Sequence, residues 1–195
     1  MELSDNGQTH PQNTAPHLRG FSVIEALIVL AIVLIVGAFA IPQTTGMLRK
    51  YRTLSNARGI ASELALAKMR AENGFTQTRL NCNFTTRSCQ LEVCTSKGAT
   101  ACNTFTAEGG PVLLSQGVSF GFGSITTPAG SQTTIQNTAQ ILFNSRGIPV
   151  TSSGAPTGTY ALYLTNQAGD RYAVTVYATG RVAVWRYTNS VWSIQ

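Results

Sequence analysis

Charged and titratable residues are scarce in this chain. Only 11% of its 195 residues are Asp, Glu, Lys or Arg, less than half of the usual ~25%. It has two histidines, His10 and His17, and eight acidic residues that form no cluster. A metal cage and a calcium site need such residues in closer groups, and a histidine-dependent hydrolase would depend on His10 or His17, which both lie in the first 20 residues. No Gly-rich loop introduces a helix, so nucleotide binding has no support either. We therefore expect no enzyme, no cofactor and no metal.

Cysteines are also few, and there is no C-x-x-C pair, which makes a zinc ribbon a poor fit. The four are Cys82, Cys89, Cys94 and Cys102. Four cysteines allow three disulfide connectivities, and the sequence does not choose among them. If residues 83–88 form a hairpin turn, Cys82 faces Cys89, and a Cys94–Cys102 bond would close the next loop. An even set of this kind suits an oxidising compartment.

Polar residues are almost absent from one segment, Phe21 to Ile41, where only Ser22 and Glu25 interrupt an apolar run. A helix of this length spans ~30 Å, the thickness of a bilayer core. The run fits a transmembrane helix, a secretory signal peptide or a buried core helix. The core helix fits poorly, because a soluble helix has one apolar stripe and this one is apolar on all faces.

The signal-peptide interpretation depends on Ala38-Phe39-Ala40, an A-x-A sequence at the end of the run. The residues before the run argue against it, since Arg19 is their only positive charge and Glu2 and Asp5 oppose it. Cleavage there would also leave Pro42 two residues after the cut. A secretory signal peptide is therefore the weaker alternative to a retained transmembrane helix.

The start of the run reads Arg19-Gly20-Phe21-Ser22-Val23-Ile24-Glu25-Ala26. This resembles the type IV prepilin (class III) signal. The resemblance implies that a prepilin peptidase/N-methyltransferase cuts between Gly20 and Phe21, removes residues 1–20 and methylates Phe21. It also implies that Glu25 pairs with the N-terminus of a neighbouring subunit during assembly. A carboxylate in hydrocarbon costs at least ~2.5 kcal/mol, so a partner is expected on physical grounds as well.

The basic residues around the run conflict with the orientation that this motif implies. Arg49, Lys50, Arg52 and Arg58 follow the run, whereas only Arg19 precedes it. The positive-inside rule alone would put the C-terminal bulk in the cytoplasm. The cleavage motif must face the cytoplasm, however, and the cysteines favour export. We therefore predict a single-pass protein of the bacterial inner membrane with a cytoplasmic N-terminus and a periplasmic C-terminal domain.

The helix is expected to continue beyond the membrane. Pro42 could kink it, and Asn73-Gly74 is a stop signal. Between them, apolar residues recur at helix-like intervals and predict a single apolar face: Met47, Tyr51, Leu54, Ile60 or Ala61, Leu64 and Met69. We predict one long helix over residues 21–74, transmembrane at 21–41.

The remainder, residues 75–195, is rich in Thr, Ser, Gly and β-branched residues. Short alternating runs separated by turn residues predict strands at Gln77–Cys82, Ser88–Cys94, Pro111–Leu114, Val118–Gly123, Gln140–Phe143, Tyr160–Thr165, Arg171–Tyr177, Arg181–Tyr187 and Val191–Ile194. Asn166–Asp170 and Ala178–Gly180 are expected to be turns, and Thr126–Thr138 an exposed loop. The predicted class is α+β: a pilin-like fold with one long N-terminal helix packed on a C-terminal antiparallel β-sheet domain.

Two segments of this domain resemble the GspH/FimT family of minor pilins and pseudopilins. Phe143-Asn144-Ser145-Arg146-Gly147 is similar to the family's F-x-x-x-G element. The stretch Tyr172–Val182, with Gly180-Arg181-Val182 at its end, resembles its closing hairpin. The family serves type II secretion systems and type IV pili.

Some FimT members bind DNA through a G-R-x-R motif. In this chain Ala183 occupies the position of the motif's second arginine. Arg186 and Arg171 are the residues that would supply the missing positive charge. From Arg49 onward there are 13 Lys and Arg against five Asp and Glu, a net charge of +8. Charge of this size supports non-specific phosphate contact, but it more often serves solubility or subunit steering. DNA is therefore a disfavoured partner, with Arg181, Arg186 and Arg171 as its expected contacts.

The sequence thus predicts a minor pseudopilin (H-type) of a type II secretion system, a structural subunit of the pseudopilus that drives protein export. The alternative is a FimT-type minor pilin of a type IV pilus that binds DNA for uptake. Expected partners are other major and minor pilins or pseudopilins, the prepilin peptidase, inner-membrane lipid before assembly, and secreted cargo. The residues do not choose between the two systems.

Overall fold

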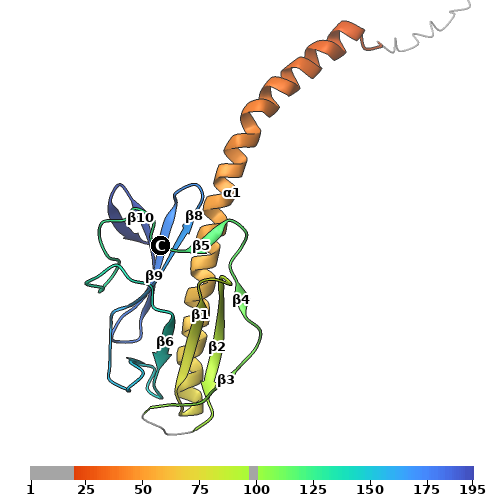
Figure 1. The fold of residues 1–195 in the computed structure, drawn as a ribbon. Coiled ribbons are helices and arrows are strands. Elements are labelled where there is room, and N and C mark those ends of the chain that lie inside the picture. The colour runs from red at the N-terminus through yellow and green to blue at the C-terminus, as the bar shows by residue number, and fades with distance from the viewer. Residues whose placement is uncertain (1–19, 97–100) are drawn as a thin grey trace, which may run out of the picture. The chain divides into compact units, whose positions relative to one another are not determined.

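The computed structural model describes residues 20–96 and 101–195, and it leaves out the side chain of Pro42. The chain divides into two compact units at Pro42, with the second unit running from Gln43 to Gln195. One helix, α1 (Val23–Gly74), contributes to both units (Figure 1). Residues 1–19 of the predicted leader lie outside the described residues.

Helix α1 has defined ends. The carbonyl oxygen of Ser22 accepts hydrogen bonds from the backbone N–H groups of Glu25 and Ala26 at 3.0 and 3.1 Å, which starts the first turn. The helix ends at Gly74, and Phe75 follows with a φ of +48°. A left-handed residue after the last turn is a common helix stop, so the helix ends where Asn73-Gly74 predicted that it would. The helix runs through Pro42 without interruption, and a kink there remains a prediction.

The second unit contains two antiparallel sheets. The first has the order β3-β2-β1-β6-β7, with β4 also paired to β2. Its strands are β1 (Thr78–Asn83), β2 (Ser88–Cys94), β3 (Phe105–Ala107), β4 (Val112–Leu113), β6 (Gln140–Phe143) and β7 (Pro149–Val150). The second has the order β11-β10-β9-β8-β5. Its strands are β5 (Val118–Phe120), β8 (Tyr160–Asn166), β9 (Arg171–Val176), β10 (Val182–Thr188) and β11 (Val191–Ile194).

The predicted α+β class, one long N-terminal helix packed on antiparallel sheet structure, is confirmed. Each of the nine predicted strands has a counterpart, whereas the three-residue β3 and the two-residue β7 were not predicted. The strands are divided between two sheets, and the sequence did not indicate which strand belongs to which sheet. Strand β6 pairs with the distant β1, in the register Leu80 opposite Ile141. Strand β5 pairs with β8. Alternation reveals a strand but carries no information about its partner.

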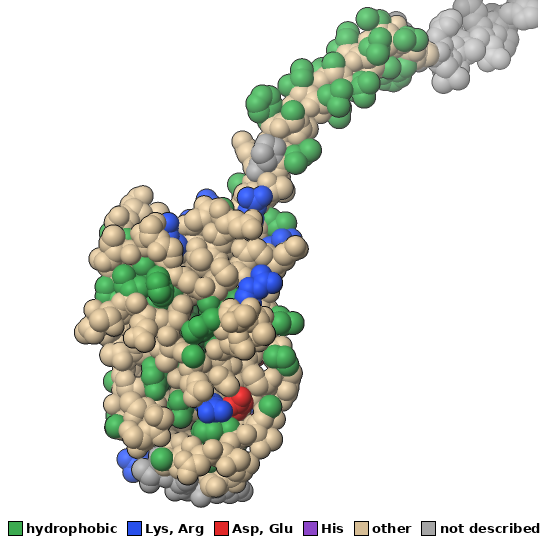
Figure 2. All heavy atoms as spheres, in the orientation of Figure 1, with side chains coloured by type: hydrophobic (Ala, Val, Ile, Leu, Met, Phe, Trp, Pro, Cys, Tyr) green, Lys and Arg blue, Asp and Glu red, His purple; other side chains and the backbone are tan. Residues whose placement is uncertain are grey.

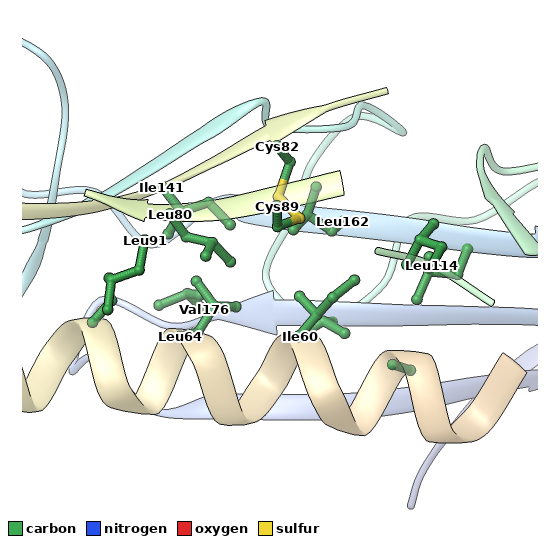
Figure 3. Close-up of a cluster of buried hydrophobic side chains, with 14 of the residues drawn as sticks. Ile60, Leu64, Leu80, Cys82, Cys89, Leu91, Leu114, Ile141, Leu162 and Val176 are labelled. Atoms are coloured by element: carbon green, nitrogen blue, oxygen red, sulfur yellow. A yellow bond between two sulfur atoms is a disulfide. The ribbon is translucent and has the colours of Figure 1, made fainter. Parts of the chain in front are cut away.

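The core of the second unit lies between α1 and the two sheets. The helix buries one stripe at intervals of three and four residues: Thr53, Ala57, Ile60, Leu64, Ala67 and Ala71. Ile60 and Leu64 point from the helix toward Leu80, Ile141 and Leu162 of the strands (Figure 3). The small alanines of the stripe let the helix backbone come close to the strands. This packing explains why the second half of the helix has an apolar face at all.

The predicted helix face is only partly correct. Ile60 and Leu64 are fully buried, but Met47, Tyr51 and Met69 are 71%, 67% and 54% exposed. Periodicity predicted that large apolar side chains would form the buried face, whereas the side chains that pack against the sheets include Thr53 and the smaller alanines. The large side chains therefore lie on the part of the helix that the unit leaves uncovered.

A second, smaller core covers the other face of the β8–β9–β10 sheet, around Tyr163 and Ala173. The segment Thr126–Thr138 has no helix or strand, as predicted, but it is not exposed throughout, because Ala129 is fully buried. The Tyr163 hydroxyl accepts a hydrogen bond from the Ala129 N–H at 3.0 Å and donates one to the side chain of Gln132. The hydroxyl group of the buried Tyr163 side chain thus anchors a polar loop that has no apolar periodicity of its own.

Candidate functional site

The apolar part of α1 is an uncovered surface. Every large apolar side chain from Val23 to Ile41 is at least 50% exposed, the lower limit being Val29. Figure 2 shows hydrophobic side chains over the visible surface of this unit. By length and composition this is the one helix among the described residues that could cross a membrane. A helix that is apolar all round needs lipid or other helices around it.

The residues of the predicted processing site lie at the start of this helix. Gly20 and Phe21 precede its first turn, and Phe21 is 79% exposed. Glu25 lies within the first turn, where the helix dipole favours a carboxylate. Its side chain is exposed and takes part in neither salt bridge that joins described residues. The geometry leaves Glu25 available to a partner, while cleavage, methylation and pairing remain predictions.

The four cysteines form two disulfides, Cys82–Cys89 and Cys94–Cys102, so none is free. Cys82 and Cys89 lie directly opposite each other in the β1–β2 pair, with Cα atoms 4.0 Å apart. This is the arrangement that a hairpin turn at residues 83–88 would produce. The Asn83 side chain supports the turn by accepting hydrogen bonds from the N–H groups of Thr85 and Thr86 at 3.0 and 3.1 Å. The first disulfide therefore cross-links the β1–β2 pair beside its turn, where the backbone already brings the two cysteines together.

Two glycines from the family-like segments meet in space. Gly147 and Gly180 both have positive φ angles, +68° and +76°. A Cβ built on Gly180 would overlap the carbonyl oxygen of Gly147 and lie 3.2 Å from the Lys68 Nζ. A Cβ on Gly147 would overlap the carboxylate of Glu72. The turn before β10 and the loop after β6 thus close over the last turns of α1. No pattern on the helix identifies Lys68 and Glu72 as their neighbours.

The three arginines proposed as DNA contacts are not brought together. Arg186 pairs with Tyr172 in the β9–β10 register, on the face of the sheet that packs toward the helix. Burial raises the pKa of Tyr172, and the positive charges of Arg186 and, more weakly, Arg58 oppose that rise. Arg171 lies on the opposite face, where its Nη2 donates to Ser124 Oγ at 2.7 Å.

Arg181 is exposed at the turn end of the same hairpin, with its guanidinium 5.6 Å from the Tyr177 ring centre. Six paired residues separate this end from Arg171, which corresponds to ~20 Å of strand. On the face of the molecule drawn in Figure 2, Lys and Arg side chains lie at several separate places. Among the described residues no three of His, Cys, Asp and Glu gather in a way that could hold a metal ion.

Comparison with known proteins gives few relatives. No protein-family model matches the chain, and no curated protein sequence matches it. Among solved structures, it is similar to the minor pseudopilin EpsH from the type II secretion system of Vibrio cholerae, in two structures. Both have 14% identity and a TM-score of 0.45, covering 68% and 70% of this chain and 95% and 94% of the EpsH chain. A likeness at this level carries no argument about function, which depends on this chain's own residues.

Proposed function

We propose that this chain is a pilin-like subunit. The apolar part of α1 anchors it in the bacterial inner membrane and later packs among like helices in a filament. The observation that carries the proposal is a helix segment whose large apolar side chains are all at least half exposed, directly after Gly20-Phe21 and with Glu25 as its only charge.

The physical chemistry of this segment supports both roles. Its backbone groups are satisfied within the helix, so lipid can surround it. Removing the same surface from water in a filament is favourable at about 25 cal/mol per Å² of apolar area. Glu25 is the exception in either setting, because an unpaired carboxylate is costly away from water. A free α-amino group on Phe21 of a neighbouring subunit, created by cleavage after Gly20, would neutralise it.

The part of α1 in the second unit has an uncovered apolar face of its own. Five large side chains of that stretch are at least 36% exposed: Met47, Leu48, Tyr51, Leu66 and Met69. Exposed apolar residues on a helix whose other face is buried suit contacts with neighbouring helices. They would continue the assembly contact beyond the anchor.

We propose the H-type minor pseudopilin of a type II secretion system as the specific role, with other pseudopilins, the prepilin peptidase and secreted cargo as partners. The second candidate is a FimT-type minor pilin of a type IV pilus. One observation favours it: Arg181 is exposed at the tip of the β9–β10 hairpin. Deleting the gene distinguishes them, since loss of protein export supports the first role and loss of pilus-dependent motility or DNA uptake supports the second.

The proposal is tested by Glu25→Ala with Glu25→Asp as the matched control. We expect Glu25→Ala to be cleaved normally and to keep the thermal unfolding temperature of the second unit, because Glu25 contributes only to assembly. Co-purification with other pilin subunits should fall by about tenfold, the effect of losing roughly 1.4 kcal/mol, and Glu25→Asp should retain it. Assembly of Glu25→Ala at the normal level would contradict the proposal.

Intact-mass measurement of the same membrane-extracted protein tests the processing step. We expect loss of Met1–Gly20 and one added methyl group on Phe21. A mature chain that begins at Ile41 would instead establish a secretory signal peptide and remove the anchor.

A further inference from the structure

A cavity of about 220 Å³ lies in the second unit beside the first turns of its helix. Arg49 and Arg52 of α1 line one side. The rest is lined by Gln116 and Gly117, which precede β5, by Val118, its first residue, and by Asn166 and Gln167 at the end of β8. Three segments far apart in the sequence therefore meet around one small space.

The lining carries positive charge and hydrogen-bond donors and no carboxylate. Arg49 and Arg52 are three residues apart, which places them on neighbouring positions of one helix face. Both are exposed, and neither takes part in the two salt bridges between described residues, Arg70–Glu108 and Arg79–Glu92. The carboxamides of Gln116 and Gln167 add donors that can turn toward a ligand. A cavity lined by guanidinium and carboxamide groups favours the binding of an anion.

One wall of the cavity is held rigidly. The carboxamide nitrogen of Asn166, a residue that is 9% exposed, donates to Thr53 Oγ1 at 2.9 Å and to Asp170 Oδ2 at 3.0 Å. Its oxygen accepts hydrogen bonds from the backbone N–H groups of Ala168 and Asp170. The carboxylate of Asp170 is thus engaged with Asn166 and is not among the lining groups. A wall fixed before binding lowers the entropy cost of holding a ligand.

We propose that this cavity binds a phosphate group, and specifically the headgroup phosphate of an anionic phospholipid. Two guanidinium groups can bind phosphate oxygens in a bidentate manner, which gives strong charge-assisted hydrogen bonds. Arg49 and Arg52 follow Ile41, the end of the apolar run, by only eight and eleven residues of chain. The anchoring proposed above therefore keeps both arginines within a short stretch of chain of the lipid headgroups. The lipid assignment rests on the membrane anchoring proposed above, whereas the phosphate site does not.

The test uses the full chain in a phosphate-free maltoside detergent, with thermal unfolding followed by tryptophan fluorescence. The two probes are a water-soluble short-chain phosphatidylglycerol and inorganic phosphate. The test variant is Arg49→Gln/Arg52→Gln. The control is Arg87→Gln/Arg146→Gln, which removes the same charge from two exposed arginines outside the cavity lining.

We expect saturable stabilisation by the lipid in the native chain and in the control. The apparent Kd should rise by about tenfold or more in the test variant, because each lost contact is a hydrogen bond to a charged group. Stabilisation by inorganic phosphate alone, lost in the test variant, would support the site and overturn its assignment to lipid. No saturable effect of either probe, or an equal loss in both double variants, would overturn the proposal. Because no filament is needed, failure here is distinguishable from failure of the assembly proposal.

Discussion

At Gly180 the backbone has a φ of +76°, and a Cβ there would overlap the carbonyl oxygen of Gly147. The obstacle is backbone, which cannot rotate away as a side chain can. Gly147 has a similar φ, but the atoms that its Cβ would meet are the ends of the flexible Glu72 and Lys68 side chains. Both glycines therefore need a positive φ angle, but only at Gly180 would an added Cβ meet a backbone atom that cannot rotate away.

We predict that Gly180→Ala destabilises the second unit more than Gly147→Ala does. The matched control is Gly169→Ala, with a φ of +80° and no atom within 4 Å of its Cβ. The control should lose only the left-handed cost of about 1–2 kcal/mol. Gly180→Ala should lose a further 1–3 kcal/mol or so, because the packed backbone has to move. Urea unfolding of the three variants measures this, and equal losses at Gly180 and Gly169 would contradict the contact with Gly147.

Both disulfides involve the β1–β2 pair. Its two disulfides span nearly equal stretches of chain, with sequence separations of 7 and 8. Loop closure alone therefore predicts nearly the same effect for each, about 2–3 kcal/mol. Their surroundings differ, because Cys82 and Cys89 belong to the main core at 3% and 2% exposure, whereas the buried Cys94 and the half-buried Cys102 lie outside it.

We predict that Cys82→Ala/Cys89→Ala lowers the free energy of unfolding more than Cys94→Ala/Cys102→Ala. The first change removes buried sulfur atoms as well as the bond, which adds a cavity cost of about 1 kcal/mol or more. Chemical denaturation under non-reducing conditions measures both losses. A larger loss for the second pair would show that the core tolerates the missing sulfurs. In the native protein, thiol labelling under denaturing, non-reducing conditions should detect no free thiol.

Over the whole molecule the positive charge is distributed rather than concentrated. Residues from Arg49 onward carry a net charge of +8, but Arg186 and Arg171 lie on opposite faces of one sheet, and Arg181 lies at the far end of the hairpin from Arg171. DNA binding depends on clustered cations that release counterions together. The separation of these three therefore weakens any single DNA-binding surface.

We predict no retardation of duplex DNA at low-micromolar protein in ~150 mM salt, the regime of weak non-specific binding. A gel-shift titration of the full chain in detergent measures this, with Arg181→Ala and Arg146→Ala as the paired variants. Retardation that Arg181→Ala abolishes and Arg146→Ala leaves intact would overturn the prediction. It would also favour the FimT-type alternative.

Local features were predictable from residues alone. The all-round apolar run, the stop at Asn73-Gly74, and strands such as Ser88–Cys94 and Gln140–Phe143 follow from composition, periodicity and turn residues. Each depends on neighbours within a few residues. The Cys82–Cys89 pairing was predictable only in part, because a short hairpin turn places the two residues opposite each other but the sequence left three connectivities open. The candidate processing site at Gly20, Phe21 and Glu25 also depends only on adjacent residues.

Features that join distant segments were decided only by the tertiary structure. The pairing of β6 with β1, the choice of Ala57 and Ala67 over Met47 and Met69 for the buried helix stripe, and the burial of Ala129 all depend on which surfaces meet. The cavity between Arg52 and Asn166 and the contact of Gly147 with Gly180 have the same origin. Periodicity states that a segment has an apolar face, but the shape and volume of the opposing surface select which side chains fill it.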